Sequence, residues 1–480
     1  MDKSNLRIAL VSLQEDAEKV PPIGLVYLAT YLNQRVGLKK ENILVLDKNY
    51  FNLDKEIDSF RPDIVGISAM TIDYPPAIAL ASKLKIKNPH QLIILGGVHV
   101  SILPESMKDC FDIGVMGEGE ETLRELIELY LKKEKFDQKD LVNINGLNYF
   151  DKGNIKQTEK RKPLELDSLP LPDFTFIPSE YFKKEEIPGM GIVGTKGILF
   201  SSRGCPYRCE FCSTSRFWGK MRLHSPEYTA RLAEDLVKKY NVDYISIIDD
   251  LFTLSPERVR EIKKEFDKRG LLNKIKGIGC MVRANLMSDE LCKAMKELKI
   301  KIINFGFESG SEKVLKYLKA GSVSVEMNKR AVVLGKKYGL NVYGSLMYGS
   351  PSENINDMKQ TNEFIDFCIK HKIDNLWSFV TTPFPGTPFW QIALSRGTVS
   401  NEMDFSLLDH HISQRPLLLD KEISTEEFRN VFEEGKSKLR KLRTKLIIRF
   451  LLKNPLNAPR LVLTHPKYYL SRVVKQLFKQ

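Results

Sequence analysis

Short apolar runs alternate with amphipathic segments through most of this 480-residue chain, and the alternation limits the folds that it can adopt. In the first third, it predicts right-handed βαβ units and a doubly wound, parallel α/β sheet. The expected strands are Leu6–Ser12, Ile43–Asp47, Asp63–Ala69, Leu92–Gly97 and Asp112–Met116, and the expected helices include Ile23–Val36, Pro76–Lys87 and Glu120–Lys133.

A second series of strand and helix patterns follows and predicts a partial (β/α)6 barrel of the TIM type, whose catalytic residues gather at the carboxyl ends of the strands. We therefore predict four regions: a Rossmann-like domain at 1–135, a linker with a hairpin at 136–195, the barrel at 196–415 and a helical region at 416–480. The expected barrel strands are Gly197–Ser202, Asp243–Ile248, Lys276–Val282, Lys301–Phe307, Asn341–Tyr348 and Asn375–Thr381.

Three cysteines follow the first barrel strand: Cys205, Cys209 and Cys212, spaced Cys-x3-Cys-x2-Cys. Three thiolates on one loop can bind three irons of a 4Fe–4S cluster and leave the fourth iron without a protein ligand. A zinc site or core cysteines are the alternatives. Zinc sites usually pair two Cys or His units, and the nearest histidine, His224, stands in no such unit. The spacing therefore favours a cluster.

This loop resembles the cluster loop of the radical S-adenosylmethionine (SAM) enzymes, in which the open iron chelates the amino and carboxylate groups of SAM. The resemblance implies further SAM contacts: Phe211 near the adenine, Asp249 and Asp250 near the amino group, Arg283 at the carboxylate, Glu308 and Ser309 at the ribose or methionine end, and Gly349 and Pro351 at the adenine. Either aspartate has an alternative role as a helix cap. Strand alternation places Cys280 on the face opposite Arg283, and Cys292 and Cys368 are interpreted as packing residues.

The first domain is similar to the cobalamin-binding domain that precedes one group of radical SAM barrels. The matching segments are Pro21–Leu25, the strand end Ile67-Ser68, Gly96-Gly97-Val98-His99 and Gly117-Glu118-Gly119-Glu120. They imply cobalamin contacts from Ser68, Gly96, Gly97, His99, Gly117 and Glu118. The Asp-x-His-x-x-Gly sequence of the wider cobalamin family is absent after the first strand, so we expect base-off cobalamin, with His99 as a polar loop contact. An α/β domain without cofactor is the alternative.

The net charge of +13 is concentrated at the C-terminus, because residues 436–480 hold 13 Lys or Arg and no Asp or Glu. The balanced remainder does not indicate nucleic-acid binding. Leu439, Leu442, Leu446, Ile447, Phe450 and Leu451 recur at helical spacing among these basic residues, and Pro459–Leu463 and Tyr468–Phe478 continue the pattern. Such a helix lies on an anionic membrane surface or packs on the barrel, and RNA binding is a third, weaker alternative because the rest of the chain is balanced in charge.

Localisation is predicted to be cytoplasmic, with peripheral contact at the inner face of the membrane as a hypothesis. The chain has no apolar run of 18 residues and no apolar signal region, and its seven cysteines suit a reducing compartment.

Together, these resemblances predict a cobalamin-dependent radical SAM enzyme that methylates an unactivated carbon of a small, hydrophobic substrate such as a lipid or tetrapyrrole. A ferredoxin or flavodoxin is the expected electron donor. One alternative is a non-methylating cyclisation or oxidative rearrangement, as in the magnesium-protoporphyrin ester cyclases. Another is a non-catalytic iron–sulfur sensor.

Overall fold

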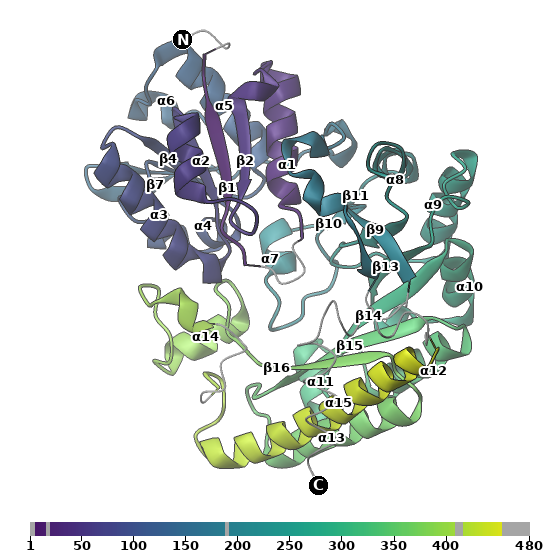
Figure 1. Cartoon of the computed structure of the whole chain (residues 1–480). Coiled ribbons are helices and arrows are strands. Elements are labelled where there is room, and N and C mark those ends of the chain that lie inside the picture. The colour runs from purple at the N-terminus through teal and green to yellow at the C-terminus, as the bar shows by residue number, and fades with distance from the viewer. Residues whose placement is uncertain (1–4, 16–19, 188–191, 409–415, 454–480) are drawn as a thin grey trace.

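The computed structural model describes residues 5–15, 20–187, 192–408 and 416–453. It contains two seven-stranded sheets, each covered by helices, and a small two-stranded ribbon, β10 (Ser202–Arg203) with β11 (Arg222–Leu223) (Figure 1). The predicted α/β class, with a doubly wound domain before a partial barrel, is confirmed.

The first sheet has the order β2-β1-β3-β4-β5-β6-β7, in which the first five strands are parallel. The hairpin β6–β7, predicted within the linker, pairs antiparallel with β5 and extends this sheet. The first sheet therefore continues past residue 135, although the domain limits themselves remain predictions. The strands are β1 (Ile8–Ser12), β2 (Ile43–Asp47), β3 (Ile64–Ser68), β4 (Leu92–Gly96), β5 (Ile113–Val115), β6 (Leu147–Asp151) and β7 (Asn154–Gln157).

Helices cover both faces of this sheet. Apolar residues of α1 and α5 pack on one face, and those of α2 and α3 pack on the other. The helices are α1 (Ile23–Tyr31), α2 (Leu53–Phe60), α3 (Tyr74–Lys87), α4 (Val98–Ile102), α5 (Gly119–Lys133) and α6 (Gln138–Leu141).

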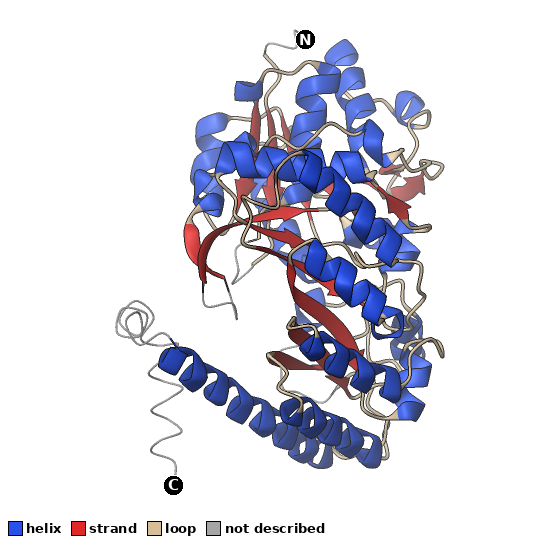
Figure 2. Ribbon diagram, turned by 90° about the vertical axis from the view of Figure 1, so that its right-hand side faces the viewer, coloured by secondary structure: helices blue, strands red, loops and turns tan. Residues whose placement is uncertain are grey.

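The second sheet has the order β16-β15-β14-β13-β12-β9-β8 and curls into a half barrel (Figure 2). Its six parallel strands are β9 (Ile192–Leu199), β12 (Tyr244–Ile247), β13 (Gly277–Val282), β14 (Ile300–Glu308), β15 (Asn341–Tyr348) and β16 (Asn375–Val380). The edge strand β8 (Lys184–Ile187) is antiparallel and was not predicted. The helices are α7 (Thr214–Trp218), α8 (Pro226–Tyr240), α9 (Pro256–Lys268), α10 (Asp289–Glu297), α11 (Glu312–Leu318), α12 (Val325–Lys337) and α13 (Ile355–Lys370).

After the barrel, the chain returns to the first domain through α14 (Pro388–Ser395) and the 3-10 turn η9 (Phe405–Leu408). Phe405 packs against Tyr74 and His99 of the first domain, and Trp390 stacks on Phe405. Figure 1 shows α14 beside α3 and α4. We call this contact the return clasp. Its side chains join the apolar core on the sheet face that α2 and α3 cover, so both domains contribute to that core.

The predicted basic helix is α15 (Thr425–Lys453), and it packs along α13 and β16. Leu439, Leu442 and Ile447 are buried, so these apolar residues serve barrel packing rather than a membrane-facing surface. Its C-terminal end projects past the barrel (Figure 2). Pro459–Leu463, Tyr468–Phe478 and the side chains of Phe450 and Leu451 lie outside the described residues. Among the described helices, none is long and apolar enough to span a bilayer.

Candidate active site

The three-cysteine loop is held by hydrogen bonds to its backbone. Arg216 donates to the carbonyl oxygens of Cys209 and Cys212 at 3.1 and 2.6 Å, and the Glu210 N–H donates to Leu318 O at the end of α11. Burial raises the pKa of the Cys205 and Cys212 thiols. None of the three cysteines is in a disulfide, so all three thiols are free to bind iron.

Asp249 supports this loop from beneath and does not face the site. Its carboxylate accepts hydrogen bonds from the Ser201 N–H, the Ser201 hydroxyl and the Ser202 N–H, and it is 1% exposed. Burial raises its pKa to about 6. The Asp249 carboxylate is thus occupied by donors of the segment before the loop, and its predicted SAM contact stays a prediction.

Asp250 lies beside the cluster loop. It accepts a hydrogen bond from the Thr214 hydroxyl at 3.1 Å and borders the cavity described below. Burial raises the pKa of its carboxyl group. This position agrees with a role near the SAM amino group, which remains a proposal.

Arg283, at the end of β13, contacts the cluster loop directly. One terminal nitrogen lies 3.4 Å from Cys209 Sγ, the other donates to Ser322 Oγ at 2.6 Å, and the guanidinium stacks on Tyr207 at 3.8 Å. As predicted, Cys280 is buried on the opposite face of β13; Cys292 and Cys368 are buried in helices.

Glu308 ends β14 in a left-handed conformation, with φ of 62°, where the register to β15 shifts. Its carboxylate pairs with Lys319 at 2.8 Å, and both side chains are nearly fully buried. The Lys319 ammonium lies 5.3 Å from the centre of the Phe211 ring, so one buried charge pair borders the cluster loop. Ser309 is fully buried, and its hydroxyl lies 3.2 Å from that of Thr361; its predicted SAM contact stays a prediction.

The predicted adenine loop, Gly349–Pro351, is anchored by Glu353. One carboxylate oxygen accepts from the N–H groups of Gly349 and Ser350 at 2.7 and 2.9 Å. The other oxygen has no partner among the described residues. Glu353 is 1% exposed, and burial raises its pKa to about 8.

A cavity of about 360 Å³ separates the carboxyl ends of the first sheet from the cluster loop. Its first-domain wall includes Ser68, Gly96, Gly97, Gly117 and Glu118, which were all predicted from the sequence. The barrel contributes Phe200, Ser202, Arg203, Phe217, Trp218, His224 and Asp250.

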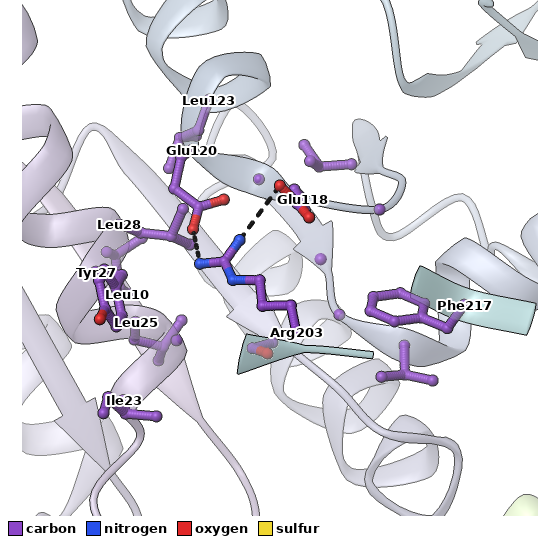
Figure 3. A pocket seen from close by; sticks show the side chains of 18 of the residues that line it. Leu10, Ile23, Leu25, Tyr27, Leu28, Glu118, Glu120, Leu123, Arg203 and Phe217 are labelled. Atoms are coloured by element: carbon purple, nitrogen blue, oxygen red, sulfur yellow. Dashed lines mark hydrogen bonds and ion pairs between the residues drawn. The ribbon is translucent and has the colours of Figure 1, made fainter. Parts of the chain in front are cut away.

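Arg203 bridges the two walls of this cavity. Its guanidinium pairs with Glu118 at 3.3 Å and with Glu120 at 2.5 Å, as Figure 3 shows. Glu118 also pairs with Arg222. The predicted cobalamin residue Glu118 thus holds the domains together, and only Gly204 separates Arg203 of this ion-pair network from Cys205.

His99 does not line the cavity, and its predicted cobalamin contact stays a prediction. The ring is fully buried, lies 2.9 Å from Ser106 Oγ and stacks on Tyr74 at 3.9 Å. Burial lowers its pKa to about 3. The return clasp covers this ring with Phe405, a contact between distant segments that local sequence does not reveal.

A sequence profile of the radical SAM superfamily matches residues 199–365, and one of the B12 binding domain matches residues 11–127. An uncharacterized methyltransferase of Pyrococcus horikoshii is 33% identical over 380 residues, which cover 78% of this chain and 79% of that protein. The chain belongs to the cobalamin-binding radical SAM family. This family assignment confirms the predicted enzyme class, a cobalamin-dependent radical SAM enzyme. The cofactors of this family member are a 4Fe–4S cluster, SAM and cobalamin.

Two further comparisons extend this assignment. The anaerobic magnesium-protoporphyrin IX monomethyl ester cyclase of Rubrivivax gelatinosus is 28% identical, over 72% of this chain and 62% of that protein. The radical SAM methyltransferase TsrM from Kitasatospora setae, solved with cobalamin and a 4Fe–4S cluster, has a TM-score of 0.66 and 17% identity, over 82% of this chain and 79% of that one. At this identity, the likeness concerns the fold.

Features of this radical SAM chain fit the three cofactors. A side chain at Gly24 or Gly117 would meet no heavy atom within 4 Å, so the backbone there leaves room for a large ligand. Beside the cluster loop, Arg283 Nε and Asn285 Oδ1 are buried without a partner among the described residues, and buried polar groups of this kind normally have one. These two atoms are therefore available to a bound SAM molecule.

Sequence reasoning missed several residues of the site. Lys319 could have been predicted from the sequence. It follows Val314, Leu315 and Leu318 on the buried side of α11, where a charged side chain needs a partner. Arg203 could not be predicted in this way, since its glutamate partners are more than 80 residues away in the sequence. Tyr207 and Ser322 were missed because their contacts with Arg283 also join separate segments of the sequence.

Proposed function

We propose that this protein methylates an unactivated carbon of a neutral, largely apolar small molecule held between the barrel and the interdomain cavity. One observation carries the proposal: Phe200, Ser202 and Arg203, which precede the three-cysteine loop, and Asp250 beside it line the same cavity as the glycine loops of the first sheet. The sites implied for SAM and for cobalamin therefore adjoin.

The chain's own residues have distinct roles in this proposal. Cys205, Cys209 and Cys212 bind the cluster, Asp250 and Asn285 orient SAM, and Gly96, Gly97 and Gly117 accommodate the corrin. When bound, the cluster and SAM supply a radical that removes hydrogen from the substrate, and cobalamin supplies the methyl group. Phe217 and Trp218 border the cavity with apolar surface that keeps water from the reacting carbon.

The inner wall of the half barrel indicates the substrate class. Strand alternation and register place Met281, Asn304, Ser345, Met347 and Phe379 on the inner face, and each is partly exposed. This part of the wall is uncharged, and its two methionines and one aromatic ring suit an apolar ligand of irregular shape. Asn304 and Ser345 offer hydrogen bonds to one polar group of the substrate.

Two finer proposals concern partners. Arg208, Arg216 and Lys220 are exposed in or beside the cluster loop, and this positive charge suits an acidic low-potential donor such as a ferredoxin or flavodoxin.

Along α15, exposed Lys441 and Lys445 are proposed to contact anionic lipid peripherally, at the inner face of the membrane.

Product analysis tests the proposed reaction. Protein reconstituted anaerobically with iron, sulfide and cobalamin is given SAM, a strong reductant and lipid and tetrapyrrole extracts, and 5′-deoxyadenosine and S-adenosylhomocysteine are quantified. Both products are expected, together with a substrate gaining 14 mass units, and Cys209→Ala is expected to abolish deoxyadenosine formation. Cys110→Ala is the matched control, because Cys110 lies in the first domain away from the loop.

The cyclase similarity supports a second candidate reaction. Deoxyadenosine without S-adenosylhomocysteine or a methylated product would favour a cyclisation or oxidative rearrangement over methyl transfer. Deoxyadenosine formation that survives Cys209→Ala would refute both candidates.

A further inference from the structure

Arg283 has a position that the predicted SAM carboxylate contact does not explain. Each terminal nitrogen of its guanidinium already has a partner within this chain: Cys209 Sγ at 3.4 Å and Ser322 Oγ at 2.6 Å. The group is fixed from a third side by the Tyr207 ring at 3.8 Å. Two-pronged binding of a carboxylate would compete with these contacts.

The surroundings hold this guanidinium in place. Ser322 donates in turn to the carbonyl oxygen of Lys319, and Asn285 donates to the Tyr207 hydroxyl at 2.9 Å. Arg283 is 8% exposed and Cys209 is 7% exposed, so solvent screens their interaction weakly. A positive charge with an N–H directed at the sulfur of an iron ligand is therefore a built feature of the loop.

We propose that Arg283 is a positioning residue that raises the reduction potential of the cluster through its hydrogen bond to Cys209 Sγ. This inference rests on the proposed function, because it requires Cys209 to bind iron. The cluster gains one electron from its donor, and no bond in the chain forms or breaks. The added negative charge is shared by the cysteine sulfurs, so a hydrogen bond from an N–H group to one sulfur and a nearby cation stabilise the reduced state. Reduction by the donor becomes easier as a result.

The chain offers a matched control. Arg216 is also an arginine beside the loop, but it donates to the backbone oxygens of Cys209 and Cys212 rather than to sulfur. Arg283→Gln and Arg216→Gln each remove one positive charge near the cluster. Only Arg283→Gln also removes a hydrogen bond to the sulfur of a cluster ligand, and only there is the lost charge buried.

The test is a redox titration of the reconstituted full-length protein, without SAM or substrate, monitored by the EPR signal of the reduced cluster. Iron and sulfide content is measured first. For Arg283→Gln we expect at least a tenfold loss in the reduction equilibrium constant, a potential more negative by about 59 mV for one electron. For Arg216→Gln we expect a shift of less than half that size. Arg283→Lys is expected to fall between wild type and Arg283→Gln, because its ammonium keeps the charge but cannot reach Cys209 and Ser322 together.

An unchanged reduction potential in Arg283→Gln with a full cluster would overturn the inference. If that variant also bound SAM more weakly, Arg283 would instead be assigned to binding the SAM carboxylate. Equal shifts in the two glutamine variants would also overturn the inference, by showing a general charge effect. If Arg283→Gln assembles no cluster, Arg283→Lys decides, and a wild-type potential there refutes the inference. Failure of the wild-type protein to bind a cluster would refute the proposed function instead.

Discussion

Glu353 allows a direct test of how the burial of a carboxyl group at this site changes the stability of the protein with pH. Its carboxyl is almost fully buried, and burial raises its pKa from an ordinary value of 4.5 to about 8. The folded protein therefore holds this proton more tightly than the unfolded chain does. Because a raised folded-state pKa favours the protonated form, its contribution to stability is present at low pH and is lost as the pH rises towards 8.

The size of this loss follows from the pKa. Each pH unit between 4.5 and 8 costs about 1.4 kcal/mol of the free energy of unfolding, which amounts to about 3 kcal/mol at pH 7. Glu353→Gln removes the ionisation but keeps an oxygen that can accept from Gly349 and Ser350. We expect the stability advantage of Glu353→Gln over wild type to grow by about 2 kcal/mol between pH 6 and pH 8 and to level off above pH 8.5.

Anaerobic thermal unfolding of the reconstituted proteins at pH 6, 7, 8 and 9 measures this effect. A barrel of this size shifts its midpoint by roughly 2–4 °C per kcal/mol, so the two curves should diverge by several degrees. Glu353→Ala is the contrasting variant, because it leaves both N–H groups without an acceptor, and we expect lower stability at every pH and weaker SAM binding. Parallel curves for wild type and Glu353→Gln would refute the reasoning.

Three further predictions test other features. Lys319→Met should lower the free energy of unfolding by about 3–5 kcal/mol, because it leaves the buried Glu308 carboxylate unpaired; the double variant with Glu308→Gln should recover most of this loss in chemical denaturation, and no recovery would contradict the pairing. Gly24→Leu should fill the open cavity wall and reduce bound cobalamin at least tenfold by absorbance, with cluster content unchanged as the control; full cobalamin binding would show that the corrin lies elsewhere. Lys441→Glu with Lys445→Glu should reduce flotation with anionic vesicles at least tenfold, at about 1 kcal/mol per basic residue; equal flotation of both proteins would refute the membrane contact.

The strands were predictable because their apolar runs are buried on both sides by helices or by the opposing wall. β2 and β15 have the predicted bounds, and most other strands differ by one or two residues. The strand ends then located most of the site, since parallel strands bring their carboxyl ends to one edge. The hairpin was also visible in the sequence, but its pairing partner β5 was not, because pairing depends on the edge that the fold leaves open.

The surroundings of Asp249 and His99 were not predictable from the sequence, for different physical reasons. Adjacent residues face different surroundings, but the sequence does not give the register between β12 and β13 that places Asp250, and not Asp249, on the face of Arg283. His99 follows the correct strand, but a segment 300 residues later covers it. Contacts between segments so far apart leave no local pattern in hydrophobicity or spacing.

The return clasp has a consequence for how the enzyme acquires its largest cofactor. Swinging the domains apart would expose Trp390, Phe405 and the faces of Tyr74 and His99, which are at most 3% exposed. At about 25 cal/mol per Å² and several hundred Å² of aromatic surface, this would cost on the order of 10 kcal/mol. Opening on that scale is too rare to serve as a loading route. The corrin must therefore enter through the mouth of the finished cavity or be enclosed while the chain folds, and cobalamin present during synthesis should give a higher occupancy than cobalamin added to the folded protein.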